Sequence, residues 1–154
     1  AAAKGLAWGL QVPCCGVSTL EAMAKNMGIY AGIVCAVMDA RRNQVYNALF
    51  RVENGDFSRI TEDRAISLAD LGAELSQMEG EVYLVGDGSL VARSALGDRV
   101  IAPAEHRMHQ RAAGVAMVAA EMIAAGAICD AESMQPNYLR LSQAEREKLE
   151  RQSK

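Results

Sequence analysis

Residues 33–38 read IVCAVM, an unbroken apolar run with the length of a single strand. Such a run is typical of a strand that is buried on both faces of a sheet. After a turn at residues 39–43, residues 44–52 follow the alternating order of a second strand. Asn54-Gly55 then supplies a dipeptide that tolerates the positive φ of a tight hairpin, and a third strand is expected at residues 57–66. The sequence thus predicts an antiparallel meander.

The apolar period changes after the meander from two residues to about 3.6, the period of a helix. Ser67 and Asp70 are placed as an N-cap pair, which predicts a helix closed by Gly80. Four further elements complete the order. They are a strand at 82–85, a helix from the turn at 86–89 through residue 96, a weak strand at 100–101 and an apolar helix at 107–125. Residues 28–125 therefore predict a complete β-β-β-α-β-α-β-α lobe.

The front of the chain predicts a helix at residues 1–10, a strand at 12–17 and a helix that the capping box of Ser18 and Glu21 opens. Helix, strand, helix is how a preceding lobe of the same design would end. We therefore expect residues 1–27 to be the remnant of a first lobe and residues 126–154 to be a C-terminal tail. The chain opens without an initiator Met or a cap and looks truncated, and its sequence does not decide between a natural, an engineered and a proteolytic origin.

The composition, 51% hydrophobic and 23% charged residues, is that of an ordinary soluble protein. A net charge of -3 gives no basic surface for gripping RNA unaided. The longest apolar helix is shorter than the roughly 20 residues that span a bilayer, and no signal-peptide pattern is present, so we expect a cytoplasmic protein with no membrane contact. The four cysteines lack C-x-x-C spacing, and His106 and His109 lack a third ligand, so no metal site is predicted.

Four motifs in order make a resemblance specific. The strings AKGLAWGLQVPCCGVSTLEAMA, MDARRNQVYNALFR, LVGDGS and PNYLR occupy residues 3–24, 38–51, 84–89 and 136–140. They resemble the bacterial family of TsaB (YeaZ) proteins, which are partner subunits in making threonylcarbamoyladenosine on tRNA. The motifs cover nearly the whole chain, so the match is far more specific than one Gly-rich turn would be.

The resemblance implies an α/β fold with a mixed sheet, in which each ribonuclease H-like lobe is half of a sugar-kinase/Hsp70/actin (actin-like ATPase) fold. It also implies a non-catalytic scaffold that binds a paralogous catalytic subunit, TsaD, through first-lobe helices. An associated ATPase subunit, TsaE, belongs to the same machinery, ATP is used by the partner complex, and tRNA is met only through the complex. The family's first strand with its Asp-Thr pair and its Gly-Pro-Gly-Ser-Phe-Thr-Gly loop are absent from this sequence.

The helix at residues 1–10 would then carry what is present of the family's association surface. The resemblance implies a partner interface on its small-residue stripe, Ala3, Leu6, Ala7 and Leu10. Ordinary core packing of the same stripe is the alternative. A chain without its first lobe would expose the stripe, so we expect the chain alone to form a homo-oligomer or to aggregate, because contiguous apolar surface finds partners.

A possible interlobe cleft is expected at the end of the central strand, from Asp39, Arg41, Gly86, Asp87 and Gly88. Nucleotide-binding members of this fold hold an adenosine at the glycine turn, but the charge of Asp87 would repel phosphate, so a plain strand-to-helix turn is the competing interpretation. Asp39 and Arg41 either pair with one another or meet a substrate.

The PNYLR motif at residues 136–140 is expected to anchor the C-terminal tail on the rest of the protein, with the ring of Tyr138 as the main contact and Arg140 beside it. We predict no catalytic residue, no metal ligand and no cofactor bound by this chain. Two alternatives to a scaffold stay open: a glycoprotease-like hydrolase or ATPase, and a stand-alone nucleotide-binding module.

Overall fold

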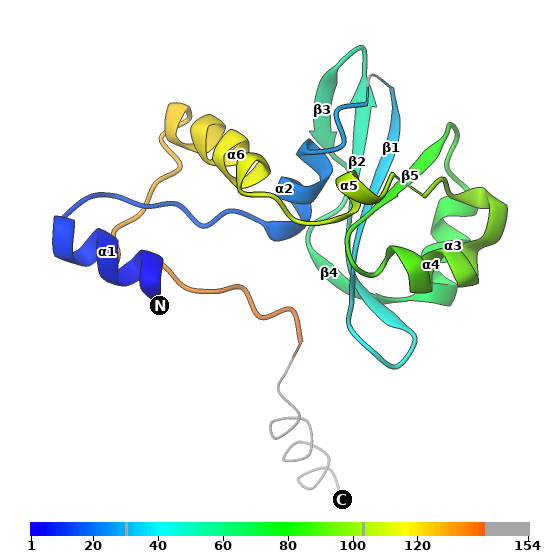
Figure 1. Ribbon diagram of the computed structural model, residues 1–154, viewed down its shortest axis with the longest axis horizontal. Helices are drawn as coiled ribbons and strands as arrows, with labels where there is room; N and C mark the ends of the chain where they lie inside the picture. The colour runs from blue at the N-terminus through cyan, green and yellow to red at the C-terminus, as the bar shows by residue number, and fades with distance from the viewer. Residues whose placement is uncertain (30, 103, 141–154) are drawn as a thin grey trace, which may run out of the picture.

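A computed structural model describes residues 1–29, 31–102 and 104–140 of the chain as a mixed α/β fold with a five-stranded mixed sheet (Figure 1). The strands are β1 (Gly32–Asp39), β2 (Gln44–Glu53), β3 (Asp56–Arg59), β4 (Arg64–Ser67) and β5 (Val82–Val85). The helices are α1 (Ala2–Leu10), α2 (Thr19–Lys25), α3 (Leu68–Ser76), α4 (Ser89–Leu96), α5 (Glu105–Met108) and α6 (Ala112–Ala124), with a 3-10 turn η1 (Gly97–Arg99) after α4.

The central position of β1 confirms the prediction made from its apolar run. The sheet order is β3-β2-β1-β5, and β4 also pairs with β2. β1 pairs antiparallel with β2 from Gly32 opposite Val52 to Asp39 opposite Val45, and parallel with β5 on its other side. The hairpin turn is also confirmed, since Asn54 and Gly55 have φ of 53° and 87°. Both edges of β1 are therefore occupied by main-chain hydrogen bonds.

Helices cover both faces of the sheet, because β1 sends apolar side chains to each. Ile33, Cys35 and Val37 pack with residues of α3 and α4 in one core cluster. Val34 and Ala36 pack with residues of α2 in a second cluster on the opposite face. All five side chains have no exposed surface. Burial of a large aliphatic side chain stabilises the fold by roughly 1.5–3 kcal/mol, so β1 anchors both layers.

One buried polar side chain sits in this sheet with its hydrogen bonds satisfied. Asn47 of β2 is fully buried and donates from Nδ2 to the carbonyl of Ala36 at 3.1 Å. Its Oδ1 accepts from Arg64 at 3.1 Å and 3.2 Å, and Arg64 also pairs with Glu74 of α3 at 2.5 Å. A buried amide costs little when its donors and acceptors are paired. The link therefore fixes β4 and α3 against the centre of the sheet.

The prediction of one strand over residues 57–66 is wrong, because two short strands, β3 and β4, share the edge of β2. Between them Ile60 and Thr61 both donate their N–H to the carbonyl of Leu49, at 2.8 Å and 3.2 Å. The Thr61 hydroxyl accepts from the Leu49 N–H at 2.9 Å, which replaces a ladder bond with a side chain. This break turns Asp63 away from the ladder and toward α2.

Two more predicted elements are corrected. No strand forms at residues 12–17, where Cys14 makes a single antiparallel bridge with Cys129, and Pro13 has no N–H to extend it. The helix expected at 107–125 begins only at Ala112, because the short helix α5 ends at Met108 and extended backbone follows at His109. The weak strand at 100–101 reduces to one parallel bridge between Ile101 and Tyr83.

α6 lies against α2 on the outer side of the sheet, and Gly114 sets how closely (Figure 1). A Cβ at Gly114 would lie 2.1 Å from the carbonyl oxygen of Ala22 and 2.7 Å from Nδ2 of Asn26. Lys25 of α2 also pairs with Glu121 of α6 at 2.8 Å. None of the helices in the described ranges has both the length and the apolar character needed to cross a membrane.

We predict that Gly114→Ala lowers the free energy of unfolding by about 2 kcal/mol, since the added methyl group forces backbone of α2 and α6 apart. Gly72→Ala is the matched control, because it makes the same change inside α3, where the Cβ meets only the end of the Leu96 side chain at 3.0 Å. That variant should stay within about 1 kcal/mol of the parent. Urea unfolding measures both, and equal effects would show that Gly114 does not set the helix contact.

Candidate functional site

The residues predicted for an interlobe cleft meet at one end of the sheet. Asp39 is the last residue of β1, and residues 86–88 form the turn from β5 into α4. Because β1 and β5 are parallel neighbours, their carboxyl ends lie at the same edge. The N–H of Gly88 donates to the carbonyl of Val37 at 3.2 Å, and a Cβ at Gly88 would lie 3.0 Å from the Asp39 nitrogen. The structure therefore brings the two motifs into contact.

The glycines of this turn are explained by packing against the chain itself. Gly86 has φ of 107°, and a Cβ there would lie 2.0 Å from the carbonyl oxygen of Val37. Its N–H donates to the carbonyl of Met108 at 2.8 Å. Asp87 is exposed, whereas Ser89 at the start of α4 is buried. The close approach that these glycines permit is thus made by β1 and not by an open phosphate cradle.

Asp39 and Arg41 are joined through the backbone. Oδ1 of the exposed Asp39 accepts from the Arg41 N–H at 2.7 Å, and within the described residues no ion pair links the two side chains. Arg41, Arg42 and Asn43 all have left-handed φ, between 56° and 60°. The carboxylate therefore acts as the acceptor of a tight turn, and the Arg41 side chain extends into solvent.

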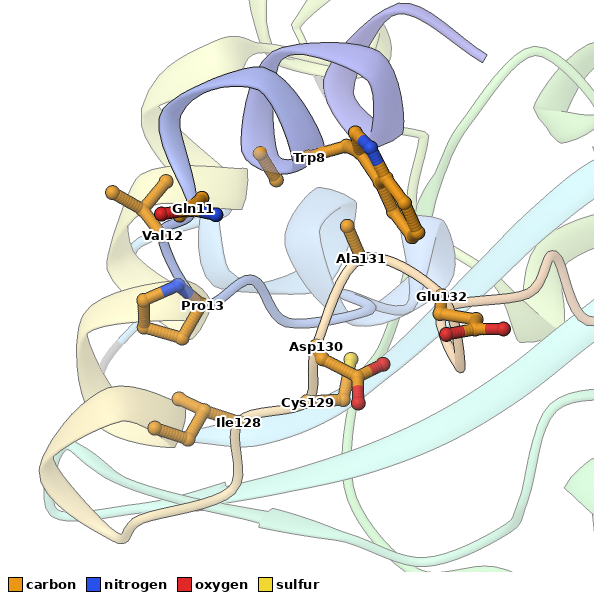
Figure 2. A pocket seen from close by; sticks show the side chains of 10 residues that line it. Trp8, Gln11, Val12, Pro13, Ile128, Cys129, Asp130, Ala131 and Glu132 are labelled. Atoms are coloured by element: carbon orange, nitrogen blue, oxygen red, sulfur yellow. The ribbon is translucent and has the colours of Figure 1, made fainter.

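The predicted stripe on α1 is divided between two faces. Leu6 and Leu10 are 66% and 69% exposed, and Ala3 is exposed, whereas Ala7 is buried. Trp8, which the stripe did not include, is also largely exposed. Behind Trp8 lies a cavity of about 600 Å³ between α1 and the segment after α6 (Figure 2), which is the smaller of two hollows beside α1 in the described part of the chain. Its lining is Ala7, Trp8, Gln11, Val12, Pro13, Ile128, Cys129, Asp130, Ala131 and Glu132.

The tail is held by two cations rather than by an aromatic ring. Nη1 of Arg140 donates to the carbonyl of Ala40 at 2.5 Å. Nζ of Lys4 in α1 donates to the carbonyls of Glu132 and Met134, at 2.9 Å and 3.2 Å. The ring of Tyr138 is 83% exposed and so does not pack on the body. Of the predicted pair, Arg140 is the residue that contacts the sheet end.

A large groove of about 1160 Å³ lies between this tail and the sheet, and sequence reasoning did not find it. It is lined by the start of α1, the linker and start of α2, the ends of β1 and β2, the break between β3 and β4, and one side of α6. The lining residues are Ala1, Ala3, Lys4, Gly16, Val17, Ser18, Thr19, Leu20, Glu21, Met38, Tyr46, Arg59, Glu62, Asp63, Val118, Met122 and 134–140.

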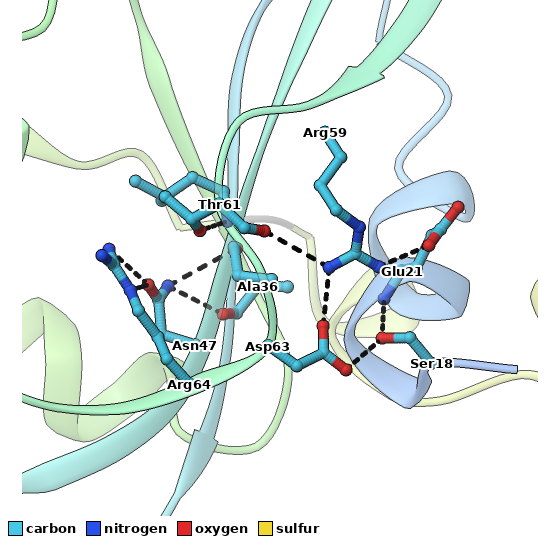
Figure 3. Close-up of polar contacts among 10 residues, drawn as sticks. Ser18, Glu21, Ala36, Asn47, Arg59, Thr61, Asp63 and Arg64 are labelled. Atoms are coloured by element: carbon cyan, nitrogen blue, oxygen red, sulfur yellow. Dashed lines mark hydrogen bonds and ion pairs between the residues drawn. The ribbon is translucent and has the colours of Figure 1, made fainter. Parts of the chain in front are cut away.

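A charged network forms one wall of the groove, as Figure 3 shows. The hydroxyl of Ser18 donates to Oδ2 of Asp63 at 2.6 Å and accepts from the N–H of Glu21 at 3.2 Å. Arg59 donates from Nη1 to Oδ1 of Asp63 at 2.7 Å and from Nη2 to Oε2 of Glu21. The predicted capping interaction at Ser18 is thereby confirmed, but the Glu21 side chain pairs with Arg59 and not with the cap.

The guanidinium of Arg59 makes its hydrogen bonds within the protein, so it is poorly available to a ligand. Its guanidinium carbon lies 4.8 Å from the centre of the Phe50 ring, and Nη1 also donates to the carbonyl of Thr61 at 3.3 Å. Burial opposes its charge, but the hydrogen bonds to Asp63 and Glu21 outweigh burial and raise the pKa of Arg59. One cation between two carboxylates leaves the wall net negative. It is suited to holding α2 on the sheet and unsuited to binding phosphate.

The local sequence pattern indicates Ser18 and Glu21 only as a helix cap and gives no role to Arg59 or Asp63. Asp63 is 45 positions from Ser18, and Arg59 is 38 from Glu21, so no local spacing links them. The one available signal was the polar segment inside the supposed third strand. Among the described residues no cluster of three His, Cys, Asp or Glu side chains is arranged for a metal.

Comparisons with known proteins identify the family of this chain. The family model described as "TsaD: tRNA N6-adenosine threonylcarbamoyltransferase" matches residues 1–148. The "tRNA threonylcarbamoyladenosine biosynthesis protein TsaB" of Bacillus subtilis is 33% identical over 154 residues, which cover 97% of this chain and 66% of that protein. The TsaB protein of Escherichia coli is also 33% identical, over 149 residues that cover 90% of this chain and 62% of the relative.

Two solved structures from Pseudomonas aeruginosa share the fold. One is described as an uncharacterized protein with similarity to peptidase YEAZ and the other as YeaZ, and each superposes with a TM-score of 0.67 at 23% and 22% identity. Each covers 90% of this chain, which spans 64% and 65% of theirs. The chain thus spans a little under two thirds of the length of several of its relatives. On its match to the family model over almost every residue and on its identity to two TsaB proteins, the chain belongs to the family that the TsaD model describes and, within it, to the TsaB (YeaZ) proteins.

Proposed function

We propose that this chain acts in the biosynthesis of threonylcarbamoyladenosine on tRNA as a scaffold that does no chemistry itself. The observation that carries the proposal is that the charged groups of the groove wall are paired within the protein itself. Arg59 donates hydrogen bonds to both Glu21 and Asp63 along the groove wall, and the turn at residues 86–88 packs against β1. Groups committed to the protein's own structure are not available as acid, base or phosphate ligand. The names of the TsaB relatives supply the pathway.

We further propose that residues 28–125 are one ribonuclease H-like lobe of an actin-like fold, that residues 1–27 belong to its companion lobe and that 126–154 are a tail. The sheet order β3-β2-β1-β5 supports this proposal. The parallel bridge between Tyr83 of β5 and Ile101 adds the segment at residues 100–101 next to β5, where the last strand of the predicted lobe would lie. In this arrangement the groove and the ends of β1 and β5 face the companion lobe.

The proposed partner is the paralogous catalytic subunit, TsaD, with TsaE as the associated ATPase and tRNA reached only through the complex in the cytoplasm. The proposed contact surface is the exposed part of α1, where Leu6 and Leu10 are 66% and 69% exposed on the outer side and Trp8 is 63% exposed at the edge of the smaller cavity. Large apolar and aromatic side chains of this kind supply most of the binding energy at protein interfaces. Ala7 faces inward and serves to seat the helix instead.

The enzymatic alternative and the nucleotide-binding alternative are weaker. Asp87 places a negative charge on the turn, and Val37 fills the space over Gly86. One observation favours a ligand there: Oγ of the buried Ser89 at the start of α4 has no hydrogen-bond partner in the described structure. This observation makes nucleotide binding the alternative to test first.

The partner surface predicts the effect of charge on α1. Leu6→Glu combined with Leu10→Glu should weaken binding to a TsaD protein by at least about tenfold, because it places two carboxylates in a desolvated apolar contact. The matched control is Leu90→Glu on α4, where the leucine is equally exposed, at 68%, on the other face of the sheet. Calorimetric titration gives the affinities, and nucleoside mass spectrometry of tRNA gives the product. A control that weakens binding as much as the double variant would move the interface away from α1.

Without a partner, the same exposed surface of α1 should pair two copies of the chain. Light scattering at increasing protein concentration should show a homo-oligomer that Leu6→Glu converts to a monomer, whereas Leu90→Glu leaves it assembled. A mass that stays monomeric for the parent at every concentration would remove this part of the proposal.

Adenine nucleotides should not bind with an affinity better than about 1 mM, because β1 occupies the approach to the glycine turn. Titration with ATP and ADP in the presence of magnesium checks this, and ATPase and peptidase assays should stay at background. Saturable binding without turnover would establish the nucleotide-binding alternative. Turnover that Asp39→Ala abolishes would instead establish the enzyme.

A further inference from the structure

Two segments far apart in the sequence are joined at a single pair of residues, Cys14 and Cys129. The N–H of each donates to the carbonyl of the other, at 2.9 Å and 2.8 Å, which is the hydrogen-bonded pair of an antiparallel ladder. Cys14 lies between α1 and α2, and Cys129 lies in the segment after α6. The pairing is therefore a seam that attaches the front of the chain to the segment before the tail.

The two thiols face one another across this seam. Their sulfur atoms lie 3.9 Å apart, and both side chains are half-buried. Opposite residues of a hydrogen-bonded antiparallel pair have Cα atoms about 5.5 Å apart, which falls within the roughly 4.4–6.8 Å that disulfides span. The backbone pairing is therefore compatible with a disulfide, and closing the bond requires the two sulfur atoms to approach by side-chain rotation. Cys129 also lines the smaller cavity, as Figure 2 shows, so a small oxidant has a path to it.

We propose that Cys14 and Cys129 are a reversible redox pair that forms an intramolecular disulfide with a low-molecular-weight disulfide, such as oxidised glutathione, as the oxidant. One cysteine thiolate attacks a sulfur of oxidised glutathione, which breaks that S–S bond and releases one glutathione thiol. The second cysteine thiolate then attacks the mixed disulfide, forms the Cys14–Cys129 bond and releases the second glutathione thiol. The protein loses two electrons and two protons, and the oxidant gains them.

Both cysteines of the pair are free thiols in the described structure. Burial raises the pKa of the Cys14 thiol, and its hydrogen bond to Cys129 and the charges of Cys129, Asp130 and Cys15 raise it further. The Cys14 thiolate is therefore scarce at neutral pH, which slows any exchange that starts from Cys14.

The other cysteines serve as internal controls. Cys15 follows Cys14 directly, but its backbone makes no bridge to the segment around Cys129. Cys35 is fully buried in β1, and burial raises its pKa to about 12, so it is inert in the folded protein. Of the four cysteines, the geometry therefore favours oxidation of the pair Cys14 and Cys129.

The consequence of the bond is to fix the position of α1. The helix reaches the segment after α6 through the Lys4 contacts to the carbonyls of Glu132 and Met134 and through the seam at Cys14. These are exposed or half-buried hydrogen bonds, which open at low cost. A covalent bond at the seam removes that opening.

The test equilibrates the full chain in glutathione buffers of decreasing reducing power, followed by acid quenching, alkylation, proteolysis and mass spectrometry. We expect a linked peptide pair that contains Cys14 and Cys129 and has lost two hydrogen atoms, with Cys35 free. Cys14→Ser and Cys129→Ser should each abolish this species, and Cys15→Ser should retain it. A linkage through Cys15, glutathione adducts without a link, disulfide-joined dimers, or two free thiols in the most oxidising buffer would each overturn the proposal.

Hydrogen exchange on the parent protein tests the structural effect without any substitution. Oxidation should slow exchange of the Cys14 and Cys129 amides, which donate across the seam, by about tenfold or more relative to the reduced protein, because local opening of the seam is blocked. Amides of β1 should exchange at the same rate in both states. A linked Cys14–Cys129 pair with unchanged exchange at the seam would overturn the claim that the bond fixes α1.

Discussion

The burial of β1 on both faces is the constraint on which the rest of the structure depends. A strand with no exposed side chain from Ile33 to Val37 needs a partner on each edge and a helical layer on each side. β2 and β5 satisfy its main chain, while α3 with α4 and α2 with its neighbours supply the two layers. The buried Asn47 belongs to the same requirement, because its amide must find partners where no water reaches.

The outer layers form a series in which each element depends on the one beneath it. The network of Ser18, Arg59 and Asp63 holds α2 on the sheet, and Gly114 allows α6 to lie against α2. The segment after α6 then carries α1 through the seam at Cys129. The charged wall of the groove is the first contact in this series, which explains why its charges are turned toward one another and not toward a ligand.

Local signals in the sequence predicted what local physics decides. The apolar run of β1, the turn at Asn54-Gly55 and the caps at Ser18 and Ser67 are all found in the structure. The broken third strand was missed because the Thr61 hydroxyl takes a place that the alternation assigned to backbone. The groove was missed because its wall joins positions 38 and 45 apart, and nothing in a one-dimensional pattern records that proximity. Exposure of Tyr138 likewise depends on where the tail runs, which no residue type specifies.

The seam also bears on the order in which the molecule folds. Its two residues are 115 positions apart, whereas the hairpin at Asn54-Gly55 joins immediate neighbours. The entropy lost on closing a loop grows with its length, so contacts of high sequence separation are made late unless a large apolar area rewards them. The seam consists of two hydrogen bonds beside a cavity. We therefore expect α1 to dock after the sheet has formed and to undock before it unfolds, as a cooperative unit whose stability is separate from that of the sheet.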